Sequence, residues 1–104
     1  MEFDQIVQRA LEIRIAYDDL NRRADQKVWD LDKCVSGFVG DVGDLVKLVM
    51  AKNNYRNGPK DIDDRLKHEI SDCLWSIITI ADKLDIDLET EFMKTMDELE
   101  ERIA

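Results

Sequence analysis

Apolar residues recur at intervals of three and four along most of this chain, which is the spacing of one face of an α-helix. The pattern predicts four helices, over residues 2–24, 27–54, 62–84 and 88–102. No segment alternates apolar and polar positions in the way that a half-buried strand does. We therefore expect an all-α fold.

Short polar segments separate the predicted helices. The first turn is expected within residues 21–26, and the Asn-Gly-Pro sequence at residues 57–59 is the clearest helix breaker. Asp61 and Asp87 are predicted N-caps of the third and fourth helices. Short connections favour antiparallel neighbours, so the chain is expected to be a single domain, residues 1–104, folded as an antiparallel four-helix bundle.

Composition narrows the function classes. The 104 residues carry 24 acidic and 15 basic side chains, a net charge of -9. Nucleic acids and anionic membranes attract basic proteins, so neither is an expected partner. The charged first twenty residues do not resemble a signal peptide, and the two cysteines lack metal-type spacing, so we expect reduced thiols and a cytoplasmic location. A core of this size is limited, and we expect oligomerisation to complete it.

Two acidic pairs interrupt the apolar runs of the second and third helices. Asp41 and Asp44 form one pair, and Glu69 and Asp72 form the other. Residues three apart lie about 60° apart on a helix, so each pair shares a face. Two such helices packed together would gather four carboxylates, and a divalent cation would relieve their repulsion. A solvated polar face explains the same spacing and remains the alternative.

The ligand set and three glycines refine this hypothesis. Only one histidine, His68, is present, so the donors are all oxygen. An all-oxygen set favours Mg²⁺, with Mn²⁺ also suitable, over zinc or a di-iron centre.

Gly37, Gly40 and Gly43 occur at intervals of three in the second predicted helix. They indicate either close approach of another helix or a local kink. A weakened, bent helix without further meaning is the simpler interpretation.

Three segments of the sequence resemble one family. Residues 40–45, Gly-Asp-Val-Gly-Asp-Leu, are similar to the Glu-Glu-x-Gly-Glu-Leu helix of the MazG nucleotide pyrophosphohydrolases. Residues 68–75, His-Glu-Ile-Ser-Asp-Cys-Leu-Trp, are similar to that family's Glu-Glu-Leu-x-Asp-Val-Leu helix. Residues 80–89 are similar to its Leu-Ala-Asp-Lys-Leu-Gly-Ile-Asp-Leu-Glu run. The resemblance implies an all-α nucleoside triphosphate pyrophosphatase that uses Mg²⁺ to release pyrophosphate and assembles as a homodimer or homotetramer.

The resemblance also implies a ligand set and its chemistry. It places the metal ligands at Asp41, Asp44, Glu69 and Asp72. Asp44 or Glu69 would orient or deprotonate the attacking water. The family has Glu where this chain has Asp41 and Asp44, and each change withdraws the carboxylate by about 1.5 Å. Closer helices or intervening waters would compensate; otherwise the site is weakened.

Four further residues are candidate substrate contacts. Lys83 and Arg65 share the polar stripe of the third helix and would contact phosphates, although an exposed helix face also accounts for them. Trp29 precedes the second helix and would stack on a base, and Phe38 would line the base pocket. Core packing is the alternative for the aromatic residues.

Two other functions remain open at this stage. The first is a regulatory protein with the same fold that binds nucleotide or metal through a catalytically weakened site, which the two Asp-for-Glu positions motivate. The second is a structural or partner-binding helical bundle without a metal site. For the enzyme, the resemblance implies a role in removing non-canonical or surplus nucleotides from the cellular pool.

Overall fold

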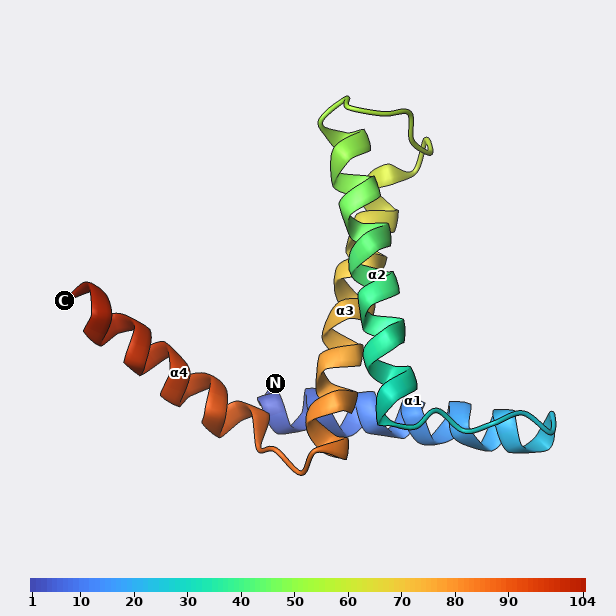
Figure 1. Ribbon diagram of the computed structural model, residues 1–104, viewed down its shortest axis with the longest axis vertical. Helices are drawn as coiled ribbons and strands as arrows, with labels where there is room; N and C mark the ends of the chain where they lie inside the picture. The colour runs from blue at the N-terminus through green and yellow to red at the C-terminus, as the bar shows by residue number, and fades with distance from the viewer.

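A computed structural model describes residues 1–104 and shows four helices and no strand (Figure 1). The all-α fold predicted from the sequence is confirmed. The helices are α1 (Phe3–Arg23), α2 (Leu31–Lys52), α3 (Ile62–Lys83) and α4 (Leu88–Ile103).

The start of α2 is the one boundary that differs clearly from the prediction, because the helix begins at residue 31 rather than 27. Asp30 has an extended backbone, and its side chain accepts a hydrogen bond of 2.9 Å from the backbone N–H of Lys33. This N-cap satisfies an N–H group that the first turn leaves free. Trp29 consequently lies in the connection before the helix, where its ring can fold back over α2.

The first three helices end in the same way. Asp25, Asn54 and Asp85 adopt the left-handed conformation, with φ of 56°, 65° and 56°. The residue after each one bonds back to the last turn; at the end of α3, the N–H of Ile86 donates to the carbonyl of Ala81 at 2.9 Å. This is the Schellman arrangement, in which glycine is the favoured residue.

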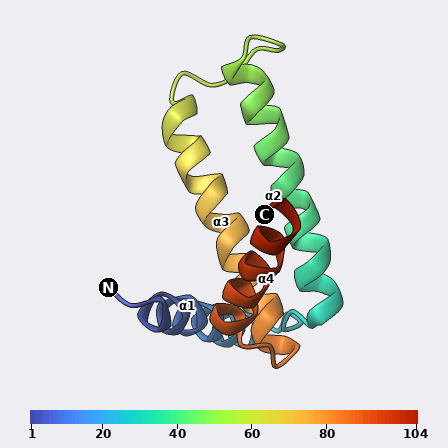
Figure 2. The same cartoon turned by 90° about the vertical axis from the view of Figure 1, so that its left-hand side faces the viewer.

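An antiparallel hairpin of α2 and α3 forms the body of the molecule (Figures 1 and 2). The helix α1 lies across the base of this hairpin and is fixed to α3 by Trp75. The indole N–H of Trp75 donates to the carbonyl of Ala10 at 2.9 Å, and its ring packs on Tyr17 with 5.6 Å between centroids. These contacts position α1 beside the polar face of α3.

The fourth helix projects away from the other three (Figure 1). Every residue of α4 after Leu88 is exposed. The predicted N-cap at Asp87 is confirmed, since its side chain accepts from the N–H of Thr90 at 3.2 Å. The helix α4 therefore forms where the sequence predicts it. Within one chain, however, only α2 and α3 lie side by side in an antiparallel arrangement.

Few side chains of the isolated chain are buried. Only Cys34, Ile78, Thr79 and Ala81 have less than a tenth of their surface exposed. The radius of gyration is 16.5 Å, whereas a compact domain of this length has about 13 Å. No helix combines the length and apolarity that crossing a membrane requires. The chain length led us to expect a limited hydrophobic core, and the core of a single copy is smaller than that expectation.

Candidate metal centre

Three of the four predicted metal ligands meet between α2 and α3. One carboxylate oxygen from each of Asp41, Glu69 and Asp72 lies within 4.8 Å of the other two. All three residues are half-buried. Helix α2 supplies the first and α3 the other two, so the antiparallel packing of the hairpin creates the cluster.

The fourth predicted ligand, Asp44, lies outside this cluster and is exposed. Asp44 and Glu69 line a second recess, which lies about one helical turn closer to the loop that joins α2 and α3. The charge of Asp44 still acts on Glu69, because it contributes to raising the pKa of that carboxyl. The structure therefore groups three acids at one point, with the fourth beside them.

Glu69 is the least satisfied member of the cluster. Its Oε2 atom is buried and has no hydrogen-bond partner. Burial raises the pKa of Glu69, and the neighbouring charges of Asp72, Asp44 and Asp41 raise it further. A buried carboxylate without a donor is unfavourable unless a cation or a proton compensates it. This orphaned oxygen, in an all-oxygen donor set, fits a hard divalent cation.

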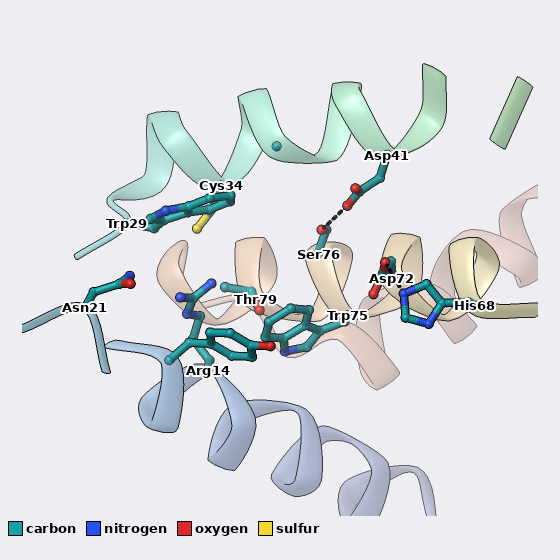
Figure 3. Close-up of a pocket in the computed structure, with 12 residues that line it drawn as sticks. Arg14, Asn21, Trp29, Cys34, Asp41, His68, Asp72, Trp75, Ser76 and Thr79 are labelled. Carbon is teal, nitrogen blue, oxygen red and sulfur yellow. Dashed lines mark hydrogen bonds and ion pairs between the residues drawn. The ribbon is translucent and has the colours of Figure 1, made fainter. Parts of the chain in front are cut away.

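The other two acids each have one partner. The hydroxyl of Ser76 donates to Oδ2 of Asp41 at 3.2 Å (Figure 3). The Nε2 atom of His68 lies 3.1 Å from Oδ2 of Asp72, although the imidazole is largely exposed. Neither Ser76 nor His68 was predicted from the sequence to have a role at this site. Both orient carboxylates of the cluster.

A recess of about 400 Å³ extends from the cluster between α1, α2 and α3. Asp41, Asp72 and His68 lie at one end (Figure 3). The other end is aromatic and contains Trp29, with Trp75 between the two ends. An acidic end and an aromatic end thus belong to one continuous space.

Arg14 organises the aromatic end. Its guanidinium carbon lies 6.0 Å from the ring centroid of Tyr17, 5.6 Å from that of Trp29 and 5.4 Å from that of Trp75. It also pairs with Asp18 at 3.1 Å, and both side chains are about six-sevenths buried (13% and 15% exposed). Sequence reasoning missed Arg14 because these partners come from three separate segments, and no local pattern marks it.

The glycines of α2 do not act together. A Cβ atom at Gly37 would lie 2.6 Å from the ring of Trp29, so glycine is needed there for the indole to fit. At Gly40 and Gly43 nothing lies within 4 Å of the Cβ position. The predicted close approach is therefore real at Gly37, but an aromatic ring makes it rather than a helix.

The predicted substrate contacts are spread over the hairpin. Trp29 lines the aromatic recess, and Arg65 lines the second recess, where it pairs with Asp61 at 3.0 Å. Phe38 is half-buried and Lys83 is exposed, and neither lines these two recesses. Lys83 comes eleven residues after Asp72, or about 16 Å along the helix axis at 1.5 Å per residue.

No protein-family model, characterised protein or solved structure matches the chain. The likeness to the MazG family therefore rests on the three sequence segments alone.

Proposed function

We propose that this protein is a Mg²⁺-dependent nucleoside triphosphate pyrophosphohydrolase that converts a (d)NTP to the monophosphate and pyrophosphate. The observation that carries the proposal is the buried, unpartnered Oε2 of Glu69 beside two other carboxylates. Without a cation, the repulsion among these carboxylates and the unpartnered oxygen destabilise the fold. A bound cation would compensate both, and we infer that these acids serve to bind one. The sequence resemblance supplies the reaction class.

The acidic residues have distinct roles in the proposed site. Asp41, Glu69 and Asp72 would hold the cation, with Mn²⁺ as an alternative to Mg²⁺. The metal, when bound, neutralises phosphate charge and makes water a better nucleophile. Glu69 would also orient or deprotonate the attacking water, with Asp44 as the other candidate. Ser76 holds the carboxylate of Asp41 in orientation.

The aromatic end of the recess would bind the base. The rings of Trp29 and Trp75 line this end, and contact with an aromatic ring is favourable for any base. The guanidinium of Arg14 is held between them and can donate to base carbonyl groups. Since the acids lie at the opposite end, a nucleotide in this recess directs its phosphates toward the cluster.

A catalytically weakened nucleotide- or metal-binding regulatory protein is the second candidate. The position of Asp44 favours it, because this side chain is exposed and is not part of the group of three acids whose oxygens lie within 4.8 Å of one another. Such a protein would bind nucleotide and cation without turnover. In either function we expect a homo-oligomer, as a homodimer or homotetramer, within the cytoplasm.

A pyrophosphate-release assay over all (d)NTPs, with Mg²⁺, Mn²⁺ or a chelator, tests the proposal. The enzyme is expected to turn over at least one nucleotide with cation present, and Glu69→Gln is expected to abolish that turnover. Glu12→Gln, at an exposed surface pair on α1, is the matched control. Nucleotide binding without turnover would establish the regulatory protein instead. Retained activity in Glu69→Gln would refute the site assignment.

A further inference from the structure

Arg14 is the only charged side chain that lines the aromatic end of the recess between α1, α2 and α3. The carboxylates that line the same recess, Asp41 and Asp72, lie at its other end (Figure 3). A guanidinium donates hydrogen bonds and accepts none. Asn21 and Thr79 also line this end, but each of them can both donate and accept. Arg14 is therefore the side chain there that distinguishes an acceptor on a ligand from a donor.

Asp18 uses only part of the donor capacity of Arg14. Its Oδ1 atom accepts from Nε of Arg14 at 3.1 Å and lies 3.1 Å from Nη2. The N–H groups of Nη1 form no hydrogen bond within the protein. Because the side chain is only 13% exposed, it has limited access to water, and a donor without a partner in such a place is unfavourable. A ligand with an acceptor would satisfy it.

The surroundings of Arg14 hold the guanidinium in one place. The ring centroids of Tyr17, Trp29 and Trp75 lie 5.4–6.0 Å from its central carbon, and the ion pair with Asp18 restrains it further. A buried, fixed donor discriminates between ligands, because a ligand without the matching acceptor leaves that donor unpaired. Arg14 thus meets the physical requirement for selectivity as well as for affinity.

The length of the recess decides which edge of a base reaches Arg14. Along α3, Trp75 and Thr79 come three and seven residues after Asp72, or about 4.5 and 10.5 Å along the helix axis at 1.5 Å per residue. A nucleotide with its phosphates at the acids has room there for the sugar and then the base. The edge of the base that is remote from the sugar consequently points toward Arg14.

That edge carries the exocyclic group at C4 of a pyrimidine or at C6 of a purine. The group is a carbonyl acceptor in thymine, uracil, guanine and hypoxanthine, and an amino donor in cytosine and adenine. A carbonyl accepts from Arg14, whereas an amino group faces a second donor. We propose that Arg14 is a specificity-determining residue that makes the recess selective for 4-oxopyrimidine and 6-oxopurine nucleotides. This inference rests on the proposed function for the placement of the phosphates, and it names the substrate class.

Binding of matched nucleotide pairs tests the selectivity without requiring turnover. The probes are α,β-methylene triphosphates, which the proposed reaction does not cleave, of uridine against cytidine and of inosine against adenosine. In Mg²⁺, calorimetry is expected to give a Kd about tenfold or more lower for the oxo member of each pair. Both tryptophans of the chain line the recess, so quenching of their fluorescence reports binding there. Equal affinity within both pairs, or tighter binding of the amino members, would overturn the proposal.

Arg14→Gln separates recognition of the base from a purely structural role. A glutamine amide both donates and accepts, so the ratio of Kd values within each pair should fall to about one. A merely structural Arg14 would weaken all four analogues alike and leave that ratio unchanged, which would refute the assignment. Arg9→Gln, at an exposed pair on the same helix, is the matched control and should keep the wild-type ratio.

The loss of Arg14 leaves Asp18 half-buried without its partner, so the double variant Arg14→Gln/Asp18→Asn serves if the single variant unfolds. The comparison of the four analogues on the wild type needs no variant at all. Pyrophosphate release from the parent triphosphates, measured in parallel, separates the two proposals. Oxo-selective binding without turnover would refute only the enzyme. Turnover with no preference within either pair would refute only the role of Arg14.

Discussion

Removing the charge of Glu69 is expected to have opposite effects with and without a divalent cation. Without cation, Glu69→Gln should be more stable than the wild type at neutral pH. Glutamine keeps nearly the same shape, removes a negative charge from beside Asp41 and Asp72, and avoids leaving an ionised oxygen buried without a partner.

The size of the effect follows from the spacing of the acids. Two unit charges at the 4.8 Å limit of the cluster repel by about 0.9 kcal/mol in a medium as polar as water. Glu69 has two such neighbours, so we expect a gain of about 1–2 kcal/mol in the free energy of unfolding. For a chain of this length that is a rise of about 4–16 °C in Tm.

Cation reverses this order. A ligand that binds only the folded state at 100 times its Kd stabilises it by about 2.7 kcal/mol. The wild type should gain this stabilisation in saturating Mg²⁺ or Mn²⁺. Glu69→Gln should gain little, because the amide is neutral and a poorer ligand. The wild type then becomes the more stable of the two proteins.

Urea denaturation at fixed protein concentration, in chelator and in Mg²⁺, measures both effects. The control is Glu12→Gln, whose exposed carboxylate pairs only with Arg9, and it should behave as the wild type does in both buffers. If Glu69→Gln destabilised the protein in chelator, the charge of Glu69 would already be compensated in the cation-free wild type. Equal stabilisation of both proteins by Mg²⁺ would show that the cation binds elsewhere.

Four smaller predictions follow from the same geometry. Folding raises the pKa of Glu69, so protonation of this carboxyl favours the folded state. In chelator, the difference in unfolding free energy between Glu69→Gln and the wild type should therefore narrow as the pH falls through that raised pKa. It should close near the ordinary value of 4.5. Asp44→Glu should lower the Kd for Mg²⁺ about tenfold in calorimetry, because the longer side chain reaches toward the cluster. Gly37→Ala should displace Trp29, shifting tryptophan fluorescence and lowering stability by about 1–3 kcal/mol in urea. Asp85→Gly should raise stability by about 0.5–1 kcal/mol in the same assay, by relieving a left-handed residue.

Local signals were sufficient to predict the helices. Apolar spacing within each segment and breakers such as Gly58 and Pro59 act over a few residues, so the sequence displays them directly. The start of α2 was wrong because apolar spacing continues through residues 27–30, whereas the cap at Asp30 decides where the helix begins. The spacing of apolar residues does not reveal an N-cap, because a cap depends on one side chain and one backbone N–H group.

The candidate site was predictable only in part, for a related reason. The spacing of Asp41, Glu69 and Asp72 places acids on facing helices, and antiparallel packing brings them together. The aromatic end of the recess depends instead on how α1 crosses the hairpin. The contacts of Arg14 with Trp29 and Trp75 join residues far apart in sequence, and no spacing rule identifies them.

The acids also explain why the core of the hairpin is small. The row of α2 that faces α3 has Asp41 at its centre, and the matching row of α3 contains Glu69 and Ser76. These polar residues occupy positions where apolar side chains would otherwise form the hairpin core, so the α2–α3 contact provides less hydrophobic stabilisation than a pair of this length allows. The apolar residues of α2 beside this row are exposed instead of buried, namely Val35, Val39, Val42, Val46 and Val49. Replacing Asp41 and Glu69 together by leucine should therefore stabilise the protein in urea denaturation and abolish its response to Mg²⁺ in the same assay.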